Sequence, residues 1–201
     1  MVPKIALLRQ IGALESTISH LVTNFPSVAF MKHDRFVEAV QRVMEMGFNP
    51  LKVVFILAVQ VLAKMSEPRL GSRFELCKRW SWPKDVVLLA FKRYSNCMLS
   101  SDEKIKKTMD ILVNKMGWPS TDIARYPTVV CFSLERSIMP RCSVMEILLA
   151  KDLVKSDLCL ATFMLLGERY FLDKYVIEFQ DRVPELFSIY KDKMELLDVG
   201  I

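Results

Sequence analysis

The segment Ser100–Gly117, SSDEKIKKTMDILVNKMG, has the pattern of an amphipathic helix with marked ends. Ser100 followed by Glu103 is the spacing of a capping box at a helix start. Gly117 suits a helix end because glycine adopts the left-handed backbone conformation that stops a helix. Lysines and other polar residues fill the remaining faces. The apolar stripe at helical spacing consists of Ile105, Met109, Leu112 and Met116.

The corner that ends this helix recurs along the chain. Gly117-Trp118-Pro119 resembles Trp80-Ser81-Trp82-Pro83 and Gly47-Phe48-Asn49-Pro50. Pro83 follows Pro50 by 33 residues, and Pro119 follows Pro83 by 36. Proline suits the first turn of a helix, where its missing N–H costs nothing, so each corner predicts one helix ending and another beginning.

A second landmark is an aromatic residue before a proline or a small residue, at Phe25-Pro26, Tyr94-Ser95 and Tyr126-Pro127. The last two lie 32 residues apart, and the first two lie 69 apart, about two periods; the missing copy falls near Gln60. Each repeat therefore reads as a long helix, a short helix and a tight connection. Because such pairs bury their apolar faces only by stacking, the sequence predicts an all-α superhelical solenoid with a repeat of roughly 34 residues.

The period sets the expected domain organisation. Residues 1–157 are predicted to form the helical repeats, of which the first is incomplete. The stretch Leu158–Tyr190 is expected to break the period, and its charged positions suit a capping unit. Residues 158–201 are accordingly predicted to form C-terminal capping helices.

Positive charge is concentrated in the middle of the chain. Residues 64–141 carry 15 basic against 8 acidic side chains, whereas residues 142–201 carry 7 against 11. A basic surface favours a polyanionic partner. The five cysteines are widely spaced and lack a C-x-x-C pair, and only two histidines occur. The pattern predicts unpaired thiols and no metal site or cofactor.

The segment Tyr126–Arg141, YPTVVCFSLERSIMPR, resembles the core repeat of the plant mitochondrial transcription termination factor (mTERF) family. Lys115-Met116-Gly117-Trp118 before it and Phe163–Phe179 after it are also similar to that family, and the resemblance covers the chain from about Phe25 to Tyr190. It implies repeats of two α-helices and a short 3₁₀ turn. Members act in mitochondria or chloroplasts, where they bind double-stranded DNA or RNA and affect transcription initiation, termination or splicing. They are usually longer and carry a transit peptide, so a truncated or shortened member is expected.

A nucleic-acid interface needs basic side chains spaced along the phosphate backbone. Arg136 and Arg141 are the first choice, because they lie in the segment most similar to the family and arginine binds a phosphate with two N–H groups. The alternative is that such residues pair with acids or cap helix ends. The landmark aromatic residues are expected to pack in the core, although they are also able to stack on bases. The candidates that flank the corners are Lys78, Arg79, Lys84, Lys92, Arg93, Arg125, Arg136 and Arg141.

Other function classes find little support in the sequence. No G-x-S-x-G, P-loop or H-E-x-x-H string occurs, so we expect no enzyme and no small-molecule substrate. The longest apolar run, Val53–Ala63, is too short to span a bilayer. A monomer that binds duplex DNA or RNA is the main hypothesis. A protein-interaction scaffold without direct nucleic-acid binding is the alternative, and a non-functional truncated copy is a third.

Overall fold

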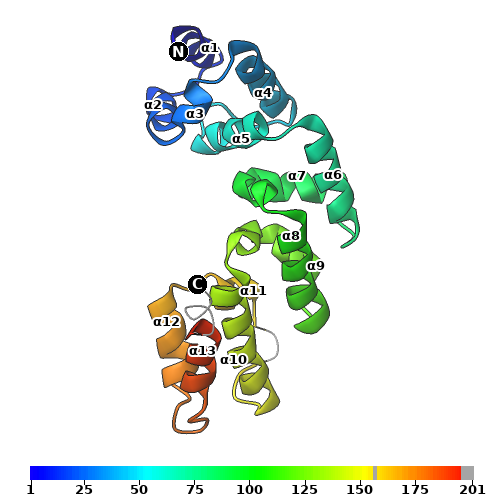
Figure 1. Cartoon of the computed structure of the whole chain (residues 1–201), viewed down its shortest axis with the longest axis vertical. Coiled ribbons are helices and arrows are strands. Elements are labelled where there is room, and N and C mark those ends of the chain that lie inside the picture. Colours follow the sequence, from blue (N-terminus) through cyan, green and yellow to red (C-terminus); the bar gives the residue numbers. More distant parts are fainter. Residues whose placement is uncertain (156–157, 196–201) are drawn as a thin grey trace. The chain divides into compact units, whose positions relative to one another are not determined.

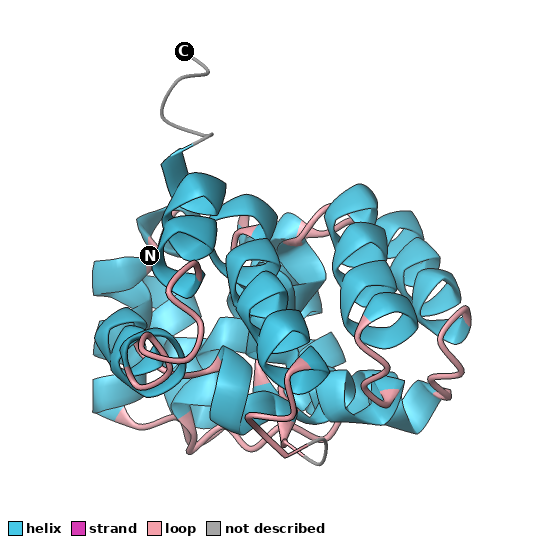
Figure 2. Ribbon diagram, turned by 90° about the horizontal axis from the view of Figure 1, so that it is seen from below, coloured by secondary structure: helices cyan, strands magenta, loops and turns pink. Residues whose placement is uncertain are grey.

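The computed structural model describes residues 1–155 and 158–195, which fold into helices joined by loops, without a β-strand in those ranges (Figures 1 and 2). The chain divides into two compact units, one ending at Ser100 and the other starting at Ser101. Each unit is built from helical repeats, which confirms the all-α repeat class.

The first unit contains three successive groups of helices. Their bounds are α1 (Val2–Gln10), α2 (Glu15–Asn24) and α3 (Pro26–Ala29); α4 (His33–Glu45) and α5 (Val53–Lys64); then α6 (Glu67–Lys78), α7 (Lys84–Arg93) and the 3₁₀ turn η1 (Ser95–Leu99).

The second unit continues the plan with π-helical segments inside its long helices. Its elements are α8 (Asp102–Met109) with η2 (Asp110–Lys115), α9 (Ser120–Arg125) and the 3₁₀ turn η3 (Pro127–Cys131); η4 (Leu134–Ile138) with α10 (Met139–Ala150), and α11 (Leu160–Met164); then α12 (Glu168–Leu172) with η5 (Asp173–Ile177), and α13 (Leu186–Glu195).

The long helices keep a regular period through both units. Their first residues are Val2, His33, Glu67, Asp102, Leu134 and Glu168, at intervals of 31, 34, 35, 32 and 34 residues. The expectation that the period breaks after Leu158 was therefore wrong for the long helix that begins at Glu168. What this region lacks is a short turn between α11 and α12. The proposed capping role of residues 158–201 remains a proposal, and residues 196–201 lie outside the described part of the chain.

Every long helix but the last ends at a residue with a left-handed backbone. Gly12, Gly47 and Gly117 have φ of +84°, +74° and +74°, while Ser81 and Asp152 reach +59° and +54° without being glycine. The next N–H then bonds back across the helix end, as from Phe48 to the Val43 carbonyl at 3.3 Å. This arrangement is a Schellman motif, which satisfies carbonyls that the helix leaves open. The predicted corners at Gly47, Ser81 and Gly117 are thus helix ends.

The aromatic landmarks mark the end of the short helices. Phe25, Tyr94 and Tyr126 share a kinked backbone, with φ/ψ of −130°/56°, −152°/88° and −126°/60°. A short turn follows each of them. In the second repeat α5 instead runs through Gln60 to Lys64 without a kink, in the place where the aromatic landmark is missing from the sequence.

In three of the repeats a basic side chain forms a hydrogen bond between the first helix and the last turn. Lys4, Arg73 and Lys104 each donate to a backbone carbonyl 27 residues ahead, on Met31, Ser100 and Cys131 respectively. The Lys104 bond measures 2.9 Å. Each acceptor lies at or just after the short turn, where a carbonyl lacks a partner within a helix. These cations tie the first helix of a repeat to its last turn.

The predicted capping box is displaced by one residue. The hydroxyl of Ser101, not Ser100, accepts a hydrogen bond from the Lys104 N–H at 3.2 Å and caps α8. The Ser100 carbonyl serves Arg73 instead. The spacing rule selected Ser100 because Glu103 follows it by three residues, but the helix begins one residue later and is capped by its neighbour Ser101.

Candidate nucleic-acid interface

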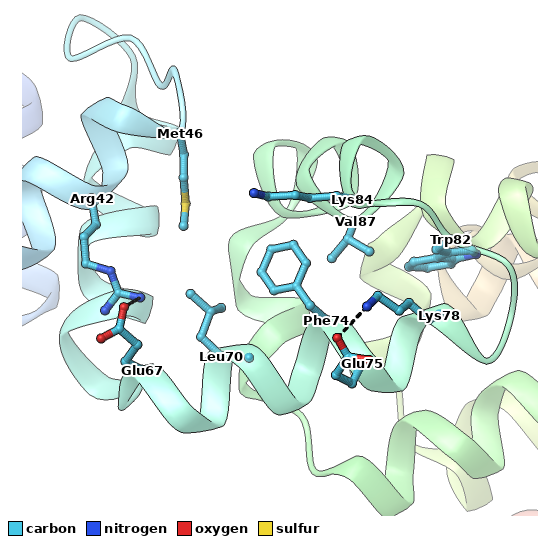
Figure 3. Close-up of a pocket in the computed structure, with 11 residues that line it drawn as sticks. Arg42, Met46, Glu67, Leu70, Phe74, Glu75, Lys78, Trp82, Lys84 and Val87 are labelled. Carbon is cyan, nitrogen blue, oxygen red and sulfur yellow. Dashed lines mark hydrogen bonds and ion pairs between the residues drawn. The ribbon is translucent and has the colours of Figure 1, made fainter.

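A groove of about 390 Å³ opens in the first unit between α4, α6 and α7 (Figure 3). Its apolar surface comes from Met46 of α4's C-terminal end, Leu70 and Phe74 of α6, the corner residue Trp82, and Val87 of α7. The period brings these side chains together, since α4 and α6 are the long helices of consecutive repeats. The groove therefore has an aromatic and aliphatic lining that is open to a ligand.

Charged side chains stand around this lining (Figure 3). Arg42 lies 3.8 Å from Glu67, and Lys78 forms an ion pair with Glu75 at 2.6 Å. Lys84 has no ion pair within the residues that the structure describes. The groove thus holds three cations and two carboxylates, and its unbalanced charge is positive.

Lys92 is half-buried and lies outside the groove lining, but close to Gly47 and Phe48. Its Nζ stands 5.8 Å from the centre of the Phe48 ring and would be 3.2 Å from a Cβ on Gly47, the residue that follows Met46. Lys78 and Lys84 were separate candidates in the sequence, and the fold brings them into the lining of one hollow. Arg79 and Arg93 are exposed near the C-terminal ends of α6 and α7.

Two of the candidates in the second unit are exposed. Arg125 ends α9, lies 3.6 Å from Asp122, and lines a hollow of about 340 Å³ with Trp118 and Lys155. Arg136 lies in η4, where its backbone N–H donates to the Ser133 hydroxyl at 3.0 Å. Both guanidinium groups lie where a phosphate has access to them.

Arg141 does not fit the predicted role. Its residue is only 4% exposed. One guanidinium nitrogen donates to the Met164 and Leu166 carbonyls at 2.9 and 2.8 Å, and the other donates to the Glu168 carboxylate at 3.1 Å. The group also lies 4.7 Å above the Phe171 ring. Arg141 is therefore a buried structural cation, because both of its terminal guanidinium nitrogens already donate to acceptors within the fold.

The landmark tryptophans are held by the core. Trp82 is 7% exposed. Trp118 donates its indole N–H to the Leu158 carbonyl at 3.3 Å and lies 5.7 Å from the Phe163 ring. This agrees with packing rather than base stacking as their first role.

A comparison with protein families decides the identity of this fold. The mTERF family model matches residues 61–172, which is more than half of the 201 residues. The chain belongs to the mTERF family. Neither the curated proteins nor the solved structures gave a match. The family is one of organellar gene-expression regulators that bind nucleic acid, and the matched region of this mTERF chain contains all eight candidate residues.

Phe74 is one of the groove residues that the sequence did not single out. It lies on α6 between the charged residues Arg73 and Glu75, away from the landmarks that mark the repeat. The signal that exists is its spacing of four residues from Leu70 and from Lys78, which places all three on one side of α6. In this mTERF protein that side faces the groove (Figure 3).

Two kinds of feature are absent from the described residues of the chain. No helix there is long and apolar enough to cross a bilayer. No group of three or more histidine, cysteine or acidic side chains is arranged to hold a metal ion in that part of the mTERF chain.

Proposed function

We propose that this mTERF protein binds double-stranded DNA or RNA in a mitochondrion or chloroplast and regulates transcription initiation, termination or RNA splicing there. The observation that carries the proposal is the presence of Lys78 and Lys84 in the lining of one groove, with Lys92 over the nearby Phe48 ring. Family membership supports it, and so does the excess of 15 basic over 8 acidic residues in residues 64–141. The protein is proposed to act as a monomer.

Electrostatics explains why these lysines matter. Most of the affinity between a protein and nucleic acid arises when cationic side chains replace the counterions along the phosphates. Exposed lysines with mobile side chains follow that backbone without reading sequence. We expect Lys84 to contribute most to the binding affinity, because no carboxylate pairs with it among the described residues. Lys78 must first break its ion pair with Glu75, in which Nζ and Oε1 lie 2.6 Å apart.

The second unit adds a smaller set of contacts. Arg125 and Arg136 are exposed, and either guanidinium has the geometry to grip a phosphate with two N–H groups. Arg141 is not part of the proposed interface. Arg79 and Arg93 remain proposed contacts at the ends of their helices.

The proposal is tested by crosslinking a tagged copy to nucleic acid in cells, recovering it under denaturing conditions and sequencing the bound material. We expect mitochondrial or chloroplast sequences. Recovery of partner proteins that persist after nuclease treatment, together with no crosslinked nucleic acid, would favour the protein-interaction scaffold instead. Light scattering of the purified protein tests the monomer, which a mass of twice 23.2 kDa would exclude.

A further inference from the structure

We propose that Cys159 is a site of reversible modification by a small anionic disulfide such as glutathione disulfide, which binds in a hollow of the second unit and exchanges with the Cys159 thiol. The hollow has a volume of about 550 Å³. One wall comes from residues 153–155 and 158–159, between α10 and α11, and the other from η5 and the two residues after it. This inference goes beyond the proposed nucleic-acid binding and does not depend on it.

Cys159 has the exposure that a modification site needs. It is exposed and forms no disulfide, whereas three of the other cysteines are buried. Cys159 also lines the hollow of about 340 Å³ that contains Arg125, and the two hollows share Lys155 and Leu158 as well. A ligand in either hollow therefore lies next to the thiol.

A buried hydroxyl in the larger hollow points to a ligand there. Tyr175 belongs to the lining and is 2% exposed, yet its hydroxyl has no hydrogen-bond partner among the described residues. By contrast, Tyr190, which contacts the same Phe171 ring, donates its hydroxyl to Glu168. A buried polar group without a partner is costly. A carboxylate of the ligand supplies the acceptor that Tyr175 lacks.

The charges of the lining match an anionic disulfide. Lys155 and Lys174 are exposed, and the Lys174 Nζ lies 5.3 Å from the centre of the Tyr175 ring. Each half of glutathione disulfide carries more carboxylates than ammonium groups, so the lysines attract it. Glu178 in the same lining is an acceptor for the ammonium group. The volume lies within the usual range for small-ligand sites.

The exchange needs no reagent besides the disulfide. The Cys159 thiolate attacks one sulfur of glutathione disulfide, and a new S–S bond forms as the original one breaks. The second glutathione leaves as a thiolate and takes up the proton that Cys159 released. Cys159 is oxidised and the departing glutathione is reduced by the same two electrons. Reduced glutathione reverses the step, so the modification follows the redox state of the glutathione pool.

The experiment measures, by mass spectrometry of the full chain, how fast three disulfides modify Cys159. They are glutathione disulfide, which is anionic, hydroxyethyl disulfide, which is neutral, and cystamine, which is cationic. Each rate is divided by the rate at Cys159 in the urea-unfolded chain, which removes the differences between the leaving groups. The folded wild type should favour glutathione disulfide and react least with cystamine, and peptide mapping should place the adduct on Cys159.

Three variants test the lining. Lys155→Gln and Lys174→Gln should each lower the rate with glutathione disulfide by about threefold and leave the rate with hydroxyethyl disulfide unchanged. Tyr175→Phe removes only the hydroxyl and should lower the rate with glutathione disulfide by about three- to tenfold. Its fold should be at least as stable as that of the wild type, because the lost hydroxyl had no partner. Lys151→Gln, at an exposed lysine outside both hollows, is the matched control and should react like the wild type.

Two results would overturn the proposal. The first is equal normalised rates for the three disulfides, or an adduct on Cys131 in place of Cys159, because either shows that no anion site directs the reaction. The second is a rate with glutathione disulfide that Tyr175→Phe, Lys155→Gln and Lys174→Gln leave as high as Lys151→Gln does. In that case Cys159 is an exposed thiol without a binding site.

Discussion

Arg141 and Glu168 form an ion pair at 3.1 Å that joins the fifth long helix to the start of the sixth. The Arg141 side chain is 5% exposed, whereas that of Glu168 is 48% exposed. The other Glu168 oxygen accepts a hydrogen bond from the Tyr190 hydroxyl on α13 at 2.5 Å. One buried cation therefore connects α10, α12 and the C-terminal helix.

Arg141→Ala should destabilise the protein by about 2–4 kcal/mol, because it leaves buried carbonyls without donors and removes packing over Phe171. Urea denaturation followed by circular dichroism measures the change. Arg136→Ala, an exposed neighbour, should change stability by less than about 0.5 kcal/mol. A stable Arg141→Ala protein with weakened nucleic-acid binding would restore Arg141 to the interface and contradict its structural role.

At the left-handed helix ends, substitution to glycine and substitution from glycine should have opposite effects on the stability of the fold. Ser81→Gly and Asp152→Gly should each stabilise the fold by about 1 kcal/mol, since non-glycine residues are strained at positive φ. Gly117→Ala should destabilise it by a similar amount. Thermal unfolding of the three variants is the measurement, and a Gly117→Ala protein as stable as the wild type would be inconsistent with the φ of +74° at that position.

Alkaline pH should weaken the fold through two buried groups. Burial raises the pKa of the Cys142 thiol from 9.0 to about 12. Burial, with a further contribution from the hydrogen bond to Glu168, also raises the pKa of Tyr190 above its usual 10.0. The unfolded chain ionises first, so the stability that these protonated groups contribute is complete below pH 9 and is lost as pH rises toward 12.

Urea titrations at pH 8, 9 and 10 should therefore show a falling free energy of unfolding, by up to about 1 kcal/mol per pH unit from Cys142 and by less from Tyr190, whose ordinary pKa of 10.0 lies at the end of this range. Cys142→Ala should flatten this slope. Cys159→Ala, at an exposed cysteine, is the control and should leave it unchanged. An equal slope in all three proteins would show that ionisation of Cys142 does not cause the loss of stability.

Cysteine accessibility gives an independent check of the same burial. Cys77, Cys97 and Cys142 are buried and Cys159 is exposed, and none of the described cysteines forms a disulfide. A thiol reagent at pH 8 should modify Cys159 at once and Cys142 only after unfolding, because the reactive species is an accessible thiolate. Rapid loss of four or more thiols in the native protein would contradict the packing.

The repeat was predictable from sequence at the helix ends that carry a residue type characteristic of such ends. Glycine at Gly47 and Gly117 and an aromatic residue at Phe25, Tyr94 and Tyr126 coincide with the helix ends of the structure. The end at Asp152 gave no signal, because an aspartate at positive φ looks like any other polar residue. Continuation of the period at Glu168 was missed for a related reason, since no landmark of either kind precedes it.

The candidate site was predictable only in part. A charge count found the basic segment, and two of the candidate lysines, Lys78 and Lys84, line the groove. It did not distinguish exposed cations from those that donate to carbonyls 27 residues ahead, such as Arg73 and Lys104, because a long-range bond to the backbone leaves no trace in local sequence. Arg141 was misassigned for this reason.

The dependence of duplex affinity on salt shows whether the groove lysines contact phosphates. Fluorescence anisotropy over a salt series gives the slope of log affinity against log salt for the wild type and for a variant with Lys78→Ala, Lys84→Ala and Lys92→Ala together. Each lost phosphate contact should flatten the slope by about 0.9, so we predict a decrease of about two to three, while Lys32→Ala, outside the groove, leaves the slope unchanged. Equal slopes for the wild type and the triple variant, or no binding by the wild type at low salt, would contradict a nucleic-acid interface at this groove.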